Sequence, residues 1–80
     1  MCVAQAVRRR VARLCRQRGI NPHALALQAG LPCSSLASLL DGRSRNPTIR
    51  TIKLICDGLG ITLGEFFDAP EFDALKQELR

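Results

Sequence analysis

Apolar residues recur along most of the chain at the three- and four-residue spacing of amphipathic helices, and two such segments are separated by only three residues. The apolar positions that share one face are Leu25, Ala26 and Ala29 in the first segment and Leu36, Leu39 and Leu40 in the second. Asn21 can cap the first helix, and Pro22 suits its first position. Gly30 can end that helix, and Pro32 prevents its continuation. The pattern therefore predicts a tight helix-turn-helix over residues 21–41.

Two longer amphipathic segments flank this helix-turn-helix. Their apolar positions are Val3, Val7, Val11 and Leu14 in the first, and Ile49, Ile52, Ile55, Cys56 and Leu59 in the second. The first helix is expected to end near Arg18, before Gly19. The second is expected to begin after Thr48 as N-cap and to end at Gly58 and Gly60. These two helices should supply most of the core behind the helix-turn-helix.

The C-terminal part predicts shorter helices. Thr62 and Glu65 have the spacing of a capping box, which begins a short helix carrying Leu63, Phe66 and Phe67. Pro70 is expected to break that helix. In the tail, residues 71–80, three apolar positions again follow a helical spacing, namely Phe72, Leu75 and Leu79. The chain is thus all-α, with one domain over residues 1–70 and an amphipathic tail that forms either a dimerisation segment or a capping helix.

Charge is distributed unevenly along the chain. Residues 1–53 contain ten Lys or Arg and one acid, a net charge of +9, whereas residues 54–80 contain two Lys or Arg and six acids, a net charge of −4. A strongly cationic half attracts polyanions, of which nucleic acid is the commonest large one. The alternative is a solvated basic helix face without a ligand.

Several classes of function find no support in the residues. The four cysteines include no C-x-x-C pair and His23 is the only histidine, which argues against a metal site. Cys15 and Cys56 are expected in the core. No catalytic constellation or phosphate-binding glycine loop occurs, so an enzyme is not expected. Without an apolar run of membrane-spanning length or a secretory signal, we expect a cytoplasmic protein without membrane contact. A single domain of 80 residues has no separate sensor, so we expect no cofactor and no small-molecule ligand.

Residues from about 10 to 68 resemble the Cro/C1-type helix-turn-helix family, the XRE-like bacterial and phage DNA-binding regulators. The residues that carry the resemblance are Arg10, Val11, Leu14, Leu25, Ala26, Gly30, Leu36, Leu39, Gly42, Pro47, Ile52, Leu59 and Gly60. The resemblance implies a compact five-helix, lambda-repressor-like DNA-binding domain. The helical spacing of the tail adds an extra C-terminal helix as an expectation. The resemblance also implies a partner, double-stranded DNA.

The resemblance further implies which residues face the DNA. The helix over residues 33–40 would lie in the major groove and contact bases through Cys33, Ser34, Ser35, Ala37 and Ser38. Phosphate contacts would come from Arg10, Asn21, Pro22, His23, Arg43, Ser44, Arg45 and Asn46. A helix N-terminus favours an anion, in agreement with the positions at residues 21–23. The base-facing side chains are small and make no bidentate contact, so direct reading of sequence should be weak.

One departure from the family concerns the core. Many members carry Arg at the position of Cys15 and Glu at that of Leu40, where they form an ion pair. We expect Cys15 and Leu40 to touch instead, with apolar packing in place of the charge pair.

Two functions stay open at this point. The first is a sequence-specific transcriptional regulator, a repressor that binds a palindromic operator as a homodimer through the aromatic C-terminal end. The second is a protein-interaction module, such as an antitoxin or accessory regulator with the same fold, which the small base-facing side chains favour. The tail capping its own core is the alternative to the dimer surface.

Overall fold

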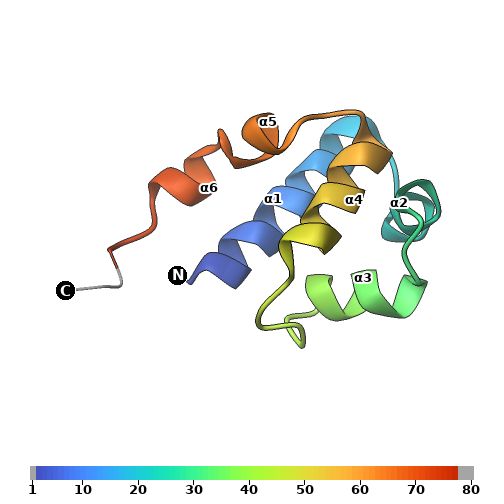
Figure 1. The fold of residues 1–80 in the computed structure, drawn as a ribbon, viewed down its shortest axis with the longest axis horizontal. Helices are drawn as coiled ribbons and strands as arrows, with labels where there is room; N and C mark the ends of the chain where they lie inside the picture. The colour runs from blue at the N-terminus through green and yellow to red at the C-terminus, as the bar shows by residue number, and fades with distance from the viewer. Residues whose placement is uncertain (1, 78–80) are drawn as a thin grey trace.

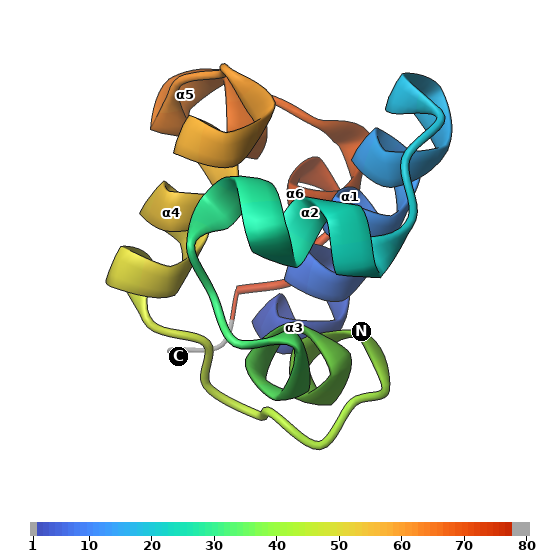
Figure 2. The same cartoon turned by 90° about the vertical axis from the view of Figure 1, so that its right-hand side faces the viewer.

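The computed structural model describes residues 2–77, which form six helices and no strand (Figure 1). The helices are α1 (Val3–Arg18), α2 (Pro22–Ala29), α3 (Cys33–Leu40), α4 (Ile49–Leu59), α5 (Leu63–Phe67) and α6 (Pro70–Asp73). Helix α2 packs against α3 and α4, and α1 contacts α3 and α6 (Figures 1 and 2). The prediction of an all-α, lambda-repressor-like domain is confirmed, with α6 as the extra helix.

The helices begin and end at the predicted signals. Asn21 Oδ1 accepts a hydrogen bond of 2.8 Å from the N–H of Ala24 in the first turn of α2. Gly30 ends α2 with φ at 70°, a left-handed conformation that glycine adopts without strain. At α5, Thr62 Oγ1 accepts from the Glu65 N–H and the Glu65 carboxylate accepts from the Thr62 N–H, each at 3.0 Å. Local capping therefore fixes both ends of α2 and the start of α5.

The core is aliphatic apart from one aromatic ring, that of Phe66. The apolar stripe of α1 covers the back of the helix-turn-helix, as predicted, and α4 supplies a second stripe. Cys15 and Cys56 are buried, and burial raises the pKa of both thiols. The core residues from the four long helices are Val7, Val11, Leu14, Cys15, Leu25, Ala26, Leu36, Leu39, Ile52, Ile55, Cys56 and Leu59. This core fixes the orientation of α3 against α1 and α4.

Gly58 corrects one predicted helix end. It was expected to end α4 together with Gly60, but α4 continues through Gly58 to Leu59, and Gly60 alone ends it with φ at 72°. Gly58 instead lies against the backbone of α2. A Cβ at this position would be 2.9 Å from the nitrogen of Ala29 and 3.0 Å from the carbonyl carbon of Gln28. The missing side chain allows α2 and α4 to approach closely.

The tail forms less helix than expected. Pro70 does not break α5, which ends at Phe67; it is the first residue of α6, a position that suits its fixed φ. Helix α6 ends at Asp73, and residues 74–77 are not continued as a helix. A segment this short gains little from helical hydrogen bonds alone. Leu79, which was placed on the same apolar face, lies outside the described residues.

The aromatic residues form one cluster at the C-terminal end of the domain. The ring of Phe66 is fully buried in the core, and its centroid lies 5.0 Å from that of Phe67 and 5.8 Å from that of Phe72. A dimer surface was expected at the aromatic C-terminal end, with Phe66 among its residues, but Phe66 cannot contribute to it because this ring fills the core. Phe67 and Phe72 are half-buried against it. This packing favours the alternative in which the beginning of the tail caps its own core.

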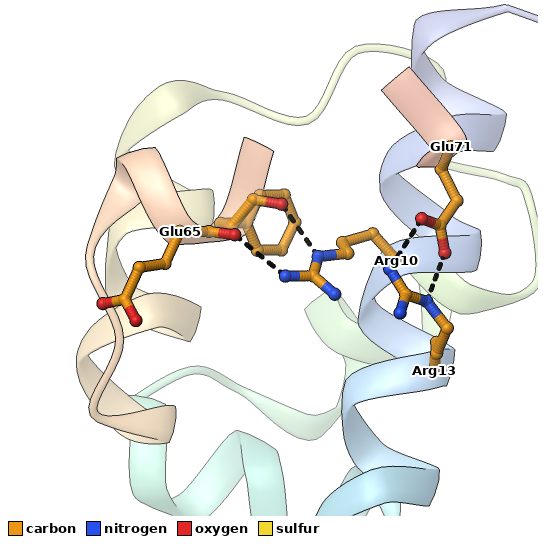
Figure 3. A network of polar contacts seen from close by, with 5 residues as sticks. Arg10, Arg13, Glu65 and Glu71 are labelled. Carbon is orange, nitrogen blue, oxygen red and sulfur yellow. Dashed lines mark hydrogen bonds and ion pairs between the residues drawn. The ribbon is translucent and has the colours of Figure 1, made fainter. Parts of the chain in front are cut away.

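An ion pair attaches α6 to α1 (Figure 3). The guanidinium of Arg13 donates from Nε to Glu71 Oε2 at 2.6 Å and from a second nitrogen to Oε1 at 2.8 Å. Glu71 has 14% of its side chain exposed, so solvent screens this pair only partly. The hydrogen bonds from Arg13 hold the pKa of Glu71 below its ordinary value.

We expect Glu71→Gln to lower the free energy of unfolding by about 1 kcal/mol at pH 7. A carboxylate whose pKa is lowered by folding stabilises the protein above its unfolded pKa, about 4.3, and loses this effect as the pH falls through the lower folded pKa. The difference between Glu71→Gln and the parent should thus shrink toward zero between about pH 5 and pH 2. Urea unfolding at several pH values measures it. Asp73→Asn, at an exposed acid of the same helix, is the control, and a pH-independent difference would argue against the ion pair as its cause.

Candidate nucleic-acid interface

Helix α3 lies at the edge of the molecule, with one side in the core and the other toward solvent (Figures 1 and 2). Leu36 and Leu39 are buried beneath it. The five residues predicted to contact bases lie on the other side: Cys33, Ser34, Ser35 and Ala37 are exposed, and Ser38 is half-buried. Four of the five positions are thus exposed, and the fifth is partly accessible. Their contact with bases stays a prediction.

The exposed side of α3 continues into a shallow groove of about 290 Å³. Ser35 and Ser38 line it from the helix, and Ser44 and Asn46 line it from the following loop. The backbone N–H of Ser44 donates to the carbonyl of Ser38 at 3.0 Å, which holds the loop against the end of α3. The structure therefore brings predicted base-contact and phosphate-contact residues together on one surface. Thr48 and Thr51 also line this groove, although the sequence offered only the capping role of Thr48.

His23 and Cys33 connect the beginnings of the two helices of the corner. The Nδ1 atom of His23 lies 3.1 Å from the Sγ atom of Cys33, and both residues are exposed. The sequence assigned them separately, to a phosphate and to a base. No periodicity links two positions in different helices across a turn, so their contact could not be read from spacing. It holds the imidazole beside the first turn of α3.

The beginning of α2 presents few donors to an anion. Pro22 has no N–H, and the N–H of Ala24 is already bonded to Asn21. First-turn amides have no acceptor within their own helix, which leaves the N–H of His23 for an anion. The side-chain oxygen of Asn21 caps the helix, and the NH₂ group of the same side chain is a second donor for an anion. Pro22 can lie beside a phosphate, but it cannot donate a hydrogen bond to it.

The loop after α3 holds one of its two arginines in an ion pair. Arg43 donates from Nε to Asp41 Oδ2 at 2.7 Å, and its backbone N–H donates to Asp41 Oδ1 at 3.0 Å. The Arg43 side chain is 70% exposed, and an ion pair this exposed contributes little free energy. A phosphate could therefore replace Asp41 as the partner of Arg43. Arg45 is exposed on the same loop.

Arg10 corrects the predicted set of phosphate contacts (Figure 3). Only 8% of this residue is exposed, and its Nε donates to the carbonyl of Phe66 at 2.8 Å. A second guanidinium nitrogen donates to the carbonyl of Glu65 at 2.9 Å. These carbonyls belong to the last turn of α5, where acceptors lack partners within the helix and attract a cation. Arg10 therefore connects α1 with α5 and is unavailable to a phosphate.

A signal for this role was present in the sequence. Arg10 stands between Val7 and Leu14 at the spacing of three and four residues that places Val3, Val7 and Leu14 on one face of α1. A cation in such a position must find acceptors when the face is buried. The periodicity thus indicates a buried position for Arg10, whereas the family resemblance implies a phosphate contact.

Cys15 and Leu40 both line a surface cavity of about 700 Å³ between α1, the start of α2 and the end of α3. Cys15 is buried and Leu40 is half-buried against the core, and contact between the two side chains stays a prediction. Both residues line the cavity, so the two small side chains leave space between these helices.

Two other features are absent from the described part of the chain. In residues 2–77, no three or more His, Cys, Asp or Glu side chains are grouped so that they could hold a metal ion. Over the same residues, no helix has the length and hydropathy needed to cross a bilayer.

Two comparisons with known proteins agree with this geometry. Residues 10–71 match the family described as the Cro/C1-type HTH DNA-binding domain. The crystal structure of the prophage Lp1 protein 11 is similar, with a TM-score of 0.80 and 32% sequence identity over 92% of this chain and 97% of that chain. No curated protein sequence matches the chain. Because the family match spans most of the chain and includes the helix-turn-helix with its exposed second helix, this protein belongs to the Cro/C1-type HTH DNA-binding domain family.

Proposed function

We propose that this protein is a small transcriptional regulator that binds specific sites on double-stranded DNA with α3 in the major groove. The observation that carries the proposal is the exposed side of α3, which lies next to the loop of residues 43–46 on one surface. Membership of a DNA-binding family supports it. An α-helix fits the major groove, where each base pair presents a distinct pattern of donors and acceptors.

The proposed phosphate contacts surround α3. The N–H of His23 and the side-chain amide of Asn21 would bind one phosphate at the start of α2, beside Pro22. Arg43, Ser44, Arg45 and Asn46 would bind another from the loop after α3. Arg10 is not among them, because its guanidinium is bonded inside the domain. These contacts set the register of α3 on the duplex and contribute most of the affinity.

Base reading is proposed to be weak for a single domain. Serine hydroxyls bond to any base edge, and Ala37 and Cys33 can only touch apolar groups such as the thymine methyl. Two copies on a palindromic operator, one helical turn apart at about 34 Å, would combine two weak half-site contacts. Binding as a homodimer that covers a promoter, and so represses it, is the mode of action we propose.

The small side chains on α3 also favour a second candidate, a protein-interaction module such as an antitoxin or accessory regulator. Leu27 adds to this case, because 69% of it is exposed on α2. A titration of the protein with duplex DNA at several salt concentrations separates the two functions. Specific binding that weakens steeply with salt supports the regulator, and no binding at about 50 mM salt would rule it out.

Replacing both Arg43 and Arg45 with Ala should weaken binding to every DNA sequence. Each phosphate contact releases counterions, so loss of two contacts should reduce the slope of log K against log salt concentration by up to about two units. Fluorescence anisotropy with an operator duplex and an unrelated duplex measures both slopes. Preference between the two duplexes should stay nearly unchanged, because phosphate contacts carry no sequence information.

A control removes the same charge elsewhere. Lys53→Ala with Lys76→Ala changes the net charge equally, at exposed residues of α4 and the tail. If this control reduces the slope as much as the Arg43 and Arg45 replacements do, the loop makes no direct phosphate contact and only the overall charge matters.

A further inference from the structure

The cavity between α1, α2 and α3 has the size of a ligand site. Its volume of about 700 Å³ lies within the range of about 300–1,000 Å³ that is usual for small-molecule pockets. Its apolar lining comes from Cys15 in α1, Ile20 in the loop before α2 and Leu40 at the end of α3. All three are buried or half-buried, so they form the inner part of the cavity. Such a surface accepts an apolar body.

Three arginines of α1 line the same cavity, namely Arg8, Arg9 and Arg16. Arg9 and Arg16 are exposed, whereas Arg8 is half-buried with its guanidinium beside Gly42. No acidic residue lines the cavity, and none of the three forms an ion pair with a carboxylate in the part of the chain that the structure describes. Guanidinium groups stay charged at any physiological pH. The opening therefore carries uncompensated positive charge.

The two properties together define the chemistry of a ligand. An apolar body would pack on Cys15, Ile20 and Leu40, and an anionic head would meet the arginines. A purely polar anion would leave the apolar lining in contact with water, and an uncharged hydrocarbon would leave the arginines without a partner. A carboxylate suits the planar donor group of arginine.

We infer that this cavity binds a monocarboxylate with a medium-length alkyl chain, held at its head by Arg9 and Arg16. The inference revises the expectation from the sequence that no small molecule would bind. That expectation came from the small size of the domain, whereas the cavity is assembled from three helices and the turn between two of them.

Binding would also affect the proposed DNA site. Asn21 and Pro22 line the cavity from the start of α2, where we propose a phosphate contact. A carboxylate bound there adds negative charge beside that contact and should weaken DNA binding. This regulatory step rests on the proposed function, whereas ligand binding itself does not.

The direct test is a titration of the full 80-residue chain with octanoate below its micelle concentration, followed by backbone amide shifts in NMR spectra. We expect saturable shifts concentrated at the ends of α1 and α3 and the start of α2. Octanol has the same alkyl chain and no charge, and its affinity should be lower than that of octanoate by a factor of at least about ten. Equal shifts from octanol, or shifts spread over the whole protein, would overturn the inference.

Two variants locate the site. Arg9→Ala with Arg16→Ala should weaken octanoate binding about tenfold, because two charge contacts are lost. Leu40→Glu should abolish it by placing a carboxylate within the cavity. Arg50→Ala with Lys53→Ala removes the same charge from exposed positions of α4, outside the cavity, and should bind octanoate as the parent does. Circular dichroism confirms that each variant is folded, and unchanged binding in the Arg9 and Arg16 variant would contradict the site.

The DNA titration is then repeated with and without saturating octanoate. Weaker DNA binding with octanoate in the parent, but not in Leu40→Glu, supports the regulatory step, and unchanged DNA binding overturns that step. Because the NMR titration contains no DNA, its outcome decides ligand binding even if the proposed DNA function is wrong.

Discussion

Replacing Arg10 with Ala is expected to lower the free energy of unfolding by about 3 kcal/mol. The guanidinium makes two hydrogen bonds to carbonyls of α5 and lies 6.0 Å from the centre of the Phe66 ring. The change removes a cation from the interior and leaves the carbonyl groups of Glu65 and Phe66 without these donors. Bonds to a charged donor contribute about 1.5–3 kcal/mol each, and the alkyl stem of Arg10 packs as well. Urea unfolding followed by circular dichroism measures the loss.

Arg9→Ala is the matched control, because Arg9 is the exposed neighbour of Arg10 in the same helix. It should change stability by less than about 0.5 kcal/mol. Arg10→Lys should restore little, since an ammonium group cannot reproduce two divergent bonds with the geometry of a guanidinium. If Arg10→Ala instead kept its stability and lost affinity for every DNA duplex, Arg10 would be a phosphate contact after all.

A single methyl group at Gly58 should destabilise the domain by about 2 kcal/mol. The new Cβ would approach the backbone nitrogen of Ala29 to 2.9 Å, and backbone atoms cannot move aside as a flexible side chain can. Overpacking of this kind costs about 1–3 kcal/mol. Alanine favours the helix over glycine by about 1 kcal/mol, which offsets part of this cost. A net loss of about 2 kcal/mol therefore corresponds to strain near the upper end of that range. Thermal or urea unfolding of Gly58→Ala gives the net effect.

Gly64→Ala supplies the comparison. Gly64 also lies inside a helix, but its nearest neighbour to a new Cβ would be Thr62 Oγ1 at 3.8 Å, an ordinary contact. This change should be neutral or stabilising by up to about 1 kcal/mol. If Gly58→Ala behaved in the same way, the close approach of α2 and α4 would not limit the residue at position 58.

The two positions show why some features could be predicted from the sequence and others could not. The ends of α2 and α5 depend on residues three or four positions apart, such as Asn21 with Ala24, so a local pattern describes them. Gly58 has the same local appearance as Gly60, and a helix that continues through it is distinguished only by its contact with α2. Tertiary packing decided the role of this glycine.

The candidate site likewise has some features that the sequence could predict and others that it could not. Helical periodicity placed Cys33, Ser34 and Ser35 on the solvent side of α3, because burial of Leu36 and Leu39 fixes the rotation of the helix. Pairs formed through turns and loops, such as His23 with Cys33 or Asp41 with Arg43, follow from backbone conformations that spacing does not describe. The helix-turn-helix followed from the apolar spacing, whereas the family resemblance supplied the phosphate contacts and assigned Arg10 wrongly, because that residue bonds inside this particular core.

The bonds of α1 to α5 and α6 have a consequence for how the domain folds. Arg10 reaches acceptors 55 and 56 residues away, and Arg13 reaches one 58 residues away. The guanidinium groups of Arg10 and Arg13 in α1 thus have these hydrogen-bond acceptors only when α5 and α6 are in place. Contacts of such long sequence separation slow folding and link the two ends of the chain in one cooperative transition. A nascent chain released only as far as α4 would carry the helix-turn-helix without the acceptors of its buried arginine.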